Sequence, residues 1–199
     1  ELAAARTRML SVEQIAERLD HDFRLLASDS HTTLPRHKTL KALIDWSYHL
    51  LSAEERALLR RLAELSGGWT LEAAEQVCAN REAEPPGENA RPGGVRLPTA
   101  QIVDLIGHLV DKSLIQFESS SNGEPRYRML ETVRQYAREQ LAVGGEEPAM
   151  RERHLDYYLA LAMEAETHLR AFGAKHWLDR LDRELVEMFA GRLGADDLL

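Results

Sequence analysis

A single β-hairpin signal stands among segments of helical periodicity, and it constrains the fold of this chain most. Two short, partly alternating runs, 114–117 and 126–129, flank a polar stretch that contains Asn122 and Gly123. Asn-Gly is the preferred pair for a tight turn between antiparallel strands, because both residues accept positive φ. We therefore expect one small hairpin in a mainly α chain.

The segments before this hairpin carry apolar residues at intervals of three and four, which indicates amphipathic helices. Ser52 and Glu55 form a capping box that opens one of them. The predicted helices lie near residues 40–51, 52–65, 70–78 and 99–112. Helices followed by a hairpin are the order of a winged helix, in which the hairpin is the wing and the preceding helix takes the recognition position.

Three further helices are expected after the hairpin. The first closes the winged helix and ends at Gly144-Gly145. The second has an apolar stripe that includes Leu155, Tyr158 and Leu159, and the third includes Trp177 and Leu178. Their short separation at Gly173 favours an antiparallel pair, such as opens a helical-repeat array.

The charge of the chain argues against base reading by the helix in the recognition position. The sequence has 25 basic and 33 acidic residues, a formal net charge of −8. Between Thr99 and Lys112 two aspartates oppose one lysine, and no arginine is present to bind a guanine edge. The candidate nucleic-acid contacts that remain are in the wing and the helix after it, at Arg126, Arg128 and Arg138.

The motifs of common enzyme and cofactor sites are missing. No phosphate-binding loop, dinucleotide-binding glycine pattern or nucleophile elbow occurs. The eight histidines lack the spacing of zinc ligands, and the single Cys78 excludes an internal disulfide. We therefore expect no enzyme activity, no cofactor and no metal site in this chain.

The ends and the hydropathy of the chain give two further expectations. The sequence starts at Glu1 within a helix-forming run and has no initiator methionine, which indicates a piece of a longer protein. No signal peptide is visible, and no stretch approaches the roughly 20 apolar residues of a membrane helix. We expect a cytoplasmic protein without a membrane partner.

Several separated blocks carry a resemblance to a known family. They include RHKTLKALIDWSYHLLS at 36–52, GGWTLEAA at 67–74, LVDKSLI at 109–115 and YRMLETVRQYA at 127–137. In this order they resemble the winged-helix region of bacterial STAND (NB-ARC-like) ATPases, as found in transcriptional regulators of the SARP and LuxR types. The resemblance implies the end of a helical ATPase subdomain at 1–33, a winged helix at 34–145 and the start of a helical-repeat (TPR-like) region at 146–199.

The resemblance also implies a site at the exit of the wing. In that family the winged helix closes over bound ADP, and a Met-His-Asp motif near the end of the wing reaches the nucleotide. The matching triplet here is Met129-Leu130-Glu131, in which leucine replaces the histidine. With Arg134, which can pair with Glu131 on one helical face, the triplet is predicted to lock the winged helix to a nucleotide-binding domain. The alternative for these residues is ordinary packing.

The function that the resemblance implies is regulatory. The parent protein would bind ATP or ADP in another domain, and this region would couple the nucleotide state to sensor repeats and an output domain. The implied partners are thus the nucleotide-binding domain and the sensor repeats of the same polypeptide, with DNA bound through another domain. The alternative from the residues is a stand-alone winged-helix DNA-binding regulator.

Overall fold

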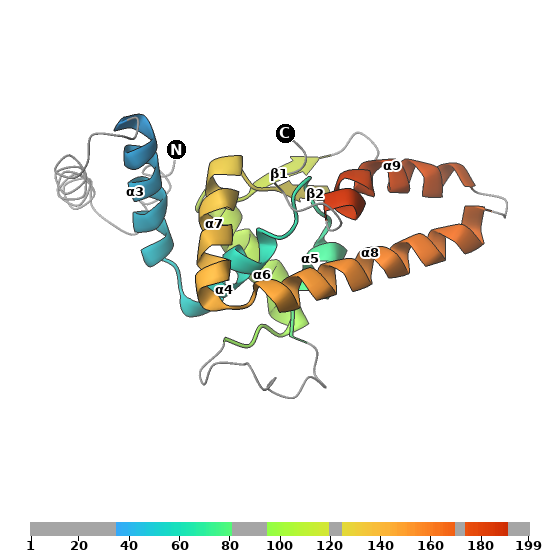
Figure 1. The fold of residues 1–199 in the computed structure, drawn as a ribbon, viewed down its shortest axis with the longest axis horizontal. Coiled ribbons are helices and arrows are strands. Elements are labelled where there is room, and N and C mark those ends of the chain that lie inside the picture. The colour runs from blue at the N-terminus through green and yellow to red at the C-terminus, as the bar shows by residue number, and fades with distance from the viewer. Residues whose placement is uncertain (1–34, 81–94, 120–124, 170–173, 191–199) are drawn as a thin grey trace.

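The computed structural model describes residues 35–80, 95–119, 125–169 and 174–190 (Figure 1). The predicted region 1–33, the loop near residues 85–94 and the turn at Asn122-Gly123 lie outside them. The described elements are α3 (Pro35–His49), α4 (Ala53–Leu62), α5 (Leu71–Cys78), α6 (Thr99–Asp111), β1 (Gln116–Ser119), β2 (Pro125–Arg128), α7 (Glu131–Gly144), α8 (Glu147–Leu169) and α9 (Ala174–Ala190). This order confirms the mainly α fold with one hairpin.

Local signals place several of the helix ends where the sequence predicted them. The Ser52 hydroxyl accepts from the Glu55 amide at 3.1 Å, and the Glu55 carboxylate accepts from the Ser52 amide at 2.8 Å. This confirms the capping box of α4. The end of α7 is also confirmed, because Gly145 adopts the left-handed conformation, with φ 71°.

The hairpin is confirmed, but its first strand starts two residues later than predicted. β1 pairs antiparallel with β2, with Gln116 opposite Arg128. Leu114 and Ile115 are both buried, and their amides bond to the Leu109 carbonyl at 3.0 and 3.4 Å. These two residues therefore close the end of α6 and fill the core, so they cannot take part in the strand pairing.

A backbone bridge joins the segment between α4 and α5 to the wing. The Trp69 amide donates to the Tyr127 carbonyl at 2.9 Å, and the Tyr127 amide donates to the Trp69 carbonyl at 2.8 Å. Gly68 precedes this bridge with φ 92°, and a Cβ there would lie 3.2 Å from the Tyr127 carbonyl oxygen. Glycine is required at this position because the backbone is left-handed and approaches β2 closely.

The core lies between α4, α5 and α6. Its largest fully buried side chains come from these helices and from the segments that follow them, and they include Trp69, Leu58, Leu62, Leu97, Ile102, Ile106, Leu109 and Leu114. α7 closes the core with Val133 and Ala137, and α8 packs along α5. This packing fixes α6 and the wing in position relative to each other.

α8 and α9 lie side by side and antiparallel, as predicted (Figure 1). The predicted stripe of α8 is wrong in part, because Tyr158 is buried but Leu155 and Leu159 are exposed. The buried face of α8 instead includes Arg153, whose guanidinium donates to the Ala79 carbonyl at 2.9 Å. The prediction from apolar periodicity treated arginine as a surface residue, so it assigned the wrong side of α8 to the core. Leu178, predicted inside α9, is also exposed.

None of the helices that the structure describes combines the length and the apolar composition that a bilayer crossing requires.

Candidate functional site

α6 and the wing are the parts of this fold that would meet a nucleic acid. α6 directly precedes the wing, and its inner side, with Ile102 and Ile106, is buried in the core. Its exposed side carries Gln101, Asp104, His108 and Asp111. The helix has no lysine or arginine anywhere between Thr99 and Asp111, so carboxylates are the charged groups that it presents.

Lys112, which follows α6, is held by the neighbouring helix. Its ammonium group is hydrogen-bonded to the Glu55 carboxylate, and both side chains are largely buried. Burial alone would raise the pKa of Glu55, but the hydrogen bonds from Lys112 and from the Ser52 amide lower it. The positive charge that directly follows α6 is thus paired with an ionised glutamate.

Arg126, predicted to contact nucleic acid from the wing, points instead toward α9. Its guanidinium is paired with the buried carboxylate of Glu184 and donates to the Gly68 carbonyl at 2.6 Å. The Tyr158 hydroxyl donates to the same carboxylate at 3.3 Å. Arg126 therefore ties the wing to the helix pair.

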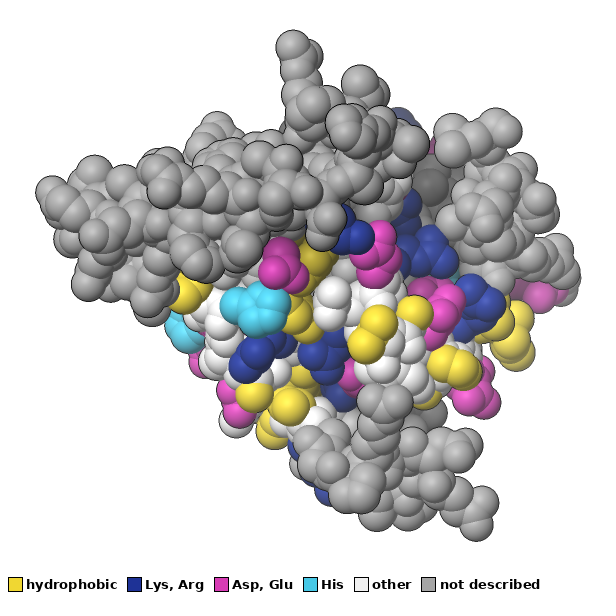
Figure 2. Space-filling model, turned by 60° about the vertical axis from the view of Figure 1, so that its left-hand side comes forward, with side chains coloured by type: hydrophobic (Ala, Val, Ile, Leu, Met, Phe, Trp, Pro, Cys, Tyr) yellow, Lys and Arg dark blue, Asp and Glu magenta, His cyan; other side chains and the backbone are white. Residues whose placement is uncertain are grey.

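Arg128 and Arg138, the other predicted contacts, lie in different environments. Arg128 is half-exposed on β2, where its Nε is 3.1 Å from a carboxylate oxygen of Glu118. Arg138 is half-buried on α7, and its charge opposes the rise in the pKa of Glu64 that burial causes. Figure 2 shows Lys and Arg interspersed with acidic side chains on the face that comes forward there, without a continuous basic patch among the described residues.

The predicted lock residues are adjacent at the exit of β2, but they differ in burial. Met129 is buried in the core, whereas Leu130 is 42% exposed at the position that precedes α7. Arg134 forms two hydrogen bonds of 2.8 Å with Glu131, and these bonds lower the pKa of Glu131. The structure thus joins Glu131 and Arg134 in an ion pair and leaves Leu130 as an apolar side chain at the surface.

An arginine cluster at the junction of α7 and α8 had no signal in the sequence patterns. Arg61 is buried, and its Nε donates to Glu146 at 2.7 Å while its terminal nitrogens reach the Cys78 and Val95 carbonyls at 2.9 and 3.0 Å. Arg60 donates to the other oxygen of Glu146 at 2.8 Å. These bonds fix α4 to the start of α8.

The described residues contain no group of three histidine, cysteine or acidic side chains that could hold a metal ion. Cys78 is fully buried, and burial raises the pKa of its thiol to about 12. A thiol with that pKa is almost entirely protonated at neutral pH, so Cys78 is a core residue and not a nucleophile.

Comparison with known proteins agrees with this geometry. Residues 95–142, from the segment before α6 to the last turns of α7, match the family model described as "Winged helix-turn-helix domain". The chain contains a winged helix. The match includes α6, the wing formed by β1 and β2, and most of α7.

Longer proteins share this winged helix and its surroundings. The chain is 42% identical over 167 residues to the "Putative HTH-type transcriptional regulator Mb0914c" of Mycobacterium bovis, a match that covers 84% of the chain but 17% of the relative. It is 39% identical over 154 residues to the "Uncharacterized protein Rv0894" of Mycobacterium tuberculosis, which covers 77% of the chain and 36% of that relative. No solved structure matches the chain.

Proposed function

We propose that this chain is the winged-helix region of a DNA-binding transcription regulator, and that its winged helix connects parts of the regulator without reading bases itself. The match at residues 95–142 and the name of the Mycobacterium bovis relative, a putative HTH-type transcriptional regulator, support the first half. The second half is carried by one observation, the exposed side of α6, which presents Asp104 and Asp111 and no cation.

The charge of α6 opposes insertion into a groove. A duplex carries one negative charge per roughly 1.7 Å of its axis, and binding requires lysines and arginines that displace its counterions. Docked in the major groove, α6 would bring two carboxylates toward the phosphates. The wing supplies no compensation through Arg126, because Glu184 already neutralises this side chain.

A second candidate is that this winged helix binds DNA directly. The description of the matching family and the name of the Mycobacterium bovis relative both specify a helix-turn-helix, and they favour this candidate. In this case Arg128 and Arg138 would contact phosphates, and the polar residues Gln101 and His108 would face the bases.

Fluorescence anisotropy with labelled 30-base-pair duplexes separates the two candidates. At 150 mM salt we expect only weak, sequence-independent binding, with a dissociation constant above about 1 μM. Replacing Asp104 and Asp111 by arginine removes two negative charges from α6 and adds two positive ones, a net change of +4, and should tighten low-salt binding at least tenfold. The same replacement at Asp179 and Asp182, exposed on α9, is the matched control. Submicromolar, sequence-preferring binding by the unaltered chain would establish direct DNA binding instead.

The finer proposal is that residues 34–145 act as a switch against a nucleotide-binding domain, while residues 146–199 lead into helical repeats. It rests on the resemblance to STAND ATPases. The side chains of the triplet at 129–131 do not fit a contact to ADP, because the Leu130 side chain has no hydrogen-bonding group and Glu131 is paired with Arg134. We therefore propose that Leu130 locks the domains by apolar contact.

The variant Leu130→Asp tests this lock in the full-length regulator. Leu130 is exposed in this chain, so the substitution should leave the winged helix folded and should act only on a closed interface. Transcriptional output and nucleotide exchange should both rise. Leu169→Asp, at the end of α8, is the comparison, because it should perturb the helix pair and leave exchange unchanged. Unchanged output and exchange in folded Leu130→Asp would remove the lock.

A further inference from the structure

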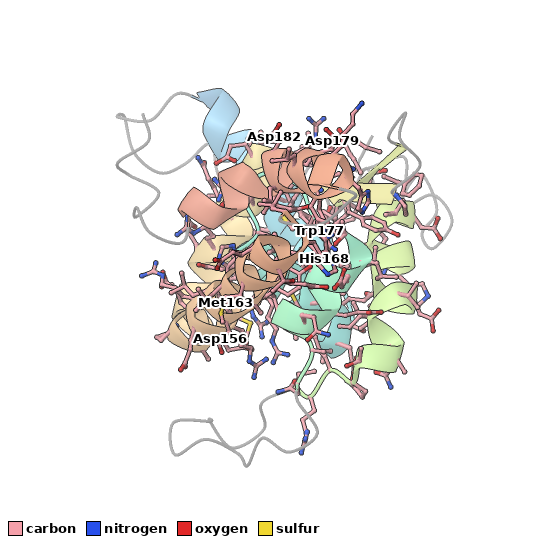
Figure 3. The ribbon with its side chains drawn as sticks, turned by 90° about the vertical axis from the view of Figure 1, so that its right-hand side faces the viewer. Asp156, Met163, His168, Trp177, Asp179 and Asp182 are labelled. Atoms are coloured by element: carbon pink, nitrogen blue, oxygen red, sulfur yellow. The ribbon has the colours of Figure 1, made fainter. Side chains whose placement is uncertain are left out.

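The outward side of α8 carries an apolar stripe that no described residue covers. Leu155, Leu159 and Met163 recur every four residues, and 42%, 62% and 62% of their surfaces are exposed. At 1.5 Å per residue the stripe is about 12 Å long, or two helical turns. Figure 3 shows Met163 and Asp156 together on the side of α8 turned away from α9.

Acidic residues surround this stripe. The exposed positions of α8 from 152 onward include Glu152, Asp156, Glu164 and Glu166, and no lysine or arginine is among them. Arg153, the one arginine in this part of α8, is buried on the opposite side against the Ala79 carbonyl. The stripe therefore has a mainly acidic rim, with the exposed Arg151 at its N-terminal end.

A shallow open depression lies at the N-terminal end of the stripe. It is lined by Glu147, Pro148, Arg151, Glu152, Leu155 and Asp156. Arg151 is 3.3 Å from the Glu147 carboxylate, so the local charge is partly balanced on that side. Pro148 and Leu155 give an apolar floor below Glu152 and Asp156, which suits a side chain with an aliphatic stem and a cationic head.

We propose that this acidic stripe of α8, formed by Leu155, Leu159 and Met163 with Glu152 and Asp156, binds an amphipathic helix of another protein that carries Lys and Arg beside its aliphatic residues. Exposed aliphatic residues at helical spacing are a common binding surface for the apolar face of such a helix. The rim selects the partner, since a second copy of α8 would place carboxylate against carboxylate. Nucleic acid and anionic lipid are repelled for the same reason.

A designed 18-residue helical peptide with a leucine stripe and flanking lysines is the probe. Its fluorescein-labelled form is titrated with the whole 199-residue chain and followed by anisotropy, beside a peptide in which glutamates replace the lysines. The basic peptide should bind saturably and the acidic peptide at least tenfold more weakly. Leu159→Gln with Met163→Gln should weaken binding of the basic peptide at least tenfold, with an unchanged circular dichroism spectrum. The control Val143→Gln, at a side chain of α7 that is 70% exposed, should stay within twofold.

Thiol alkylation locates the bound peptide. Cys78 is fully buried, so a Met163→Cys variant carries one reactive thiol on the stripe. The basic peptide should slow alkylation at position 163 at least fivefold and leave a Val143→Cys variant unaffected. Equal binding of both peptides, no effect of the stripe variant, or no protection at position 163 would overturn the proposal. Sedimentation that shows a dimer abolished by the stripe variant would also overturn it, because the occupant would then be a second copy.

Discussion

The side of the winged helix that meets α8 and α9 and the side formed by α6 place their charged residues differently. On the first side, Arg61 and Arg126 are largely buried and paired with Glu146 and Glu184. On the second side, Asp104 and its neighbours are exposed without a cation on the same helix. Winged helices can bind DNA, yet the buried arginines of this one hold the chain together. The position of each charge, and not the fold class, therefore decides which surface can meet a phosphate.

The largest effect is expected at the buried junction. Arg61→Met leaves the Glu146 carboxylate and the Cys78 and Val95 carbonyls without their donor, and removal of one partner of a buried pair costs about 3–5 kcal/mol. Urea unfolding followed by circular dichroism measures this loss. Arg56→Met, at a half-buried side chain of α4 that donates to the Ser52 carbonyl at 3.4 Å, should cost less than about 0.5 kcal/mol. An equal loss of unfolding free energy in the two variants would mean that the bonds of Arg61 stabilise the chain no more than those of Arg56.

The second-largest loss of stability is expected from breaking the ion pair between Arg126 of the wing and Glu184 of α9. Glu184→Gln removes the charge that holds Arg126 and weakens the acceptor of the Tyr158 hydroxyl, at a cost of about 1–3 kcal/mol. The same urea experiment applies, with Asp182→Asn on the exposed side of α9 as the control. An unchanged midpoint for Glu184→Gln would show that Arg126 is not fixed by α9 and is available to other ligands.

Two glutamates near the junction, the half-buried Glu146 and the buried Glu64, should respond to pH in opposite directions. Burial alone would raise the pKa of Glu146, but Arg61 and Arg60 lower it below the ordinary 4.5. Its contribution to stability is therefore complete above pH 4.5 and is lost as the pH falls below that value. For Glu64 burial dominates and raises the pKa, so its ionisation on going to neutral pH costs stability.

Variants of these two residues test the signs. At pH 7 Glu64→Gln should stabilise the chain by about 0.5–1 kcal/mol, because it removes a partly desolvated charge. Glu146→Gln should destabilise it at pH 7 and should flatten the loss of stability below pH 4.5. Urea midpoints at several pH values provide the readout, and the same sign of change in both variants at pH 7 would contradict the assignment.

The smallest loss of stability is expected from breaking the surface ion pair between Glu131 and Arg134. Glu131→Gln breaks an ion pair whose glutamate lies at the surface, and such pairs contribute roughly 0–1 kcal/mol. We expect a loss below about 0.5 kcal/mol by urea unfolding in low salt. A loss as large as that of Glu184→Gln would place Glu131 among the structural residues and would weaken its proposed role at an interface.

Local patterns determined the parts of the fold that depend on neighbours in sequence. The capping box of Ser52 and Glu55 spans four residues, and the stop at Gly145 requires only the φ of that residue. The lack of cations on α6 could also be read directly, because residues three and four apart share a face of a helix. Such features are decided within one or two turns and do not depend on what packs against them.

Tertiary packing decided the rest, including the use of the arginines. Arg61 and Glu146 are 85 positions apart, and Arg126 and Glu184 are 58 apart. With 25 basic and 33 acidic residues, many pairings are equally compatible with helical periodicity. A charge is buried only where the approach of another element supplies its partners, as Ala79 does for Arg153 on α8. Burial of that arginine turns Leu155 and Leu159 outward, against the apolar pattern, because a helix can present only one of its faces to the core.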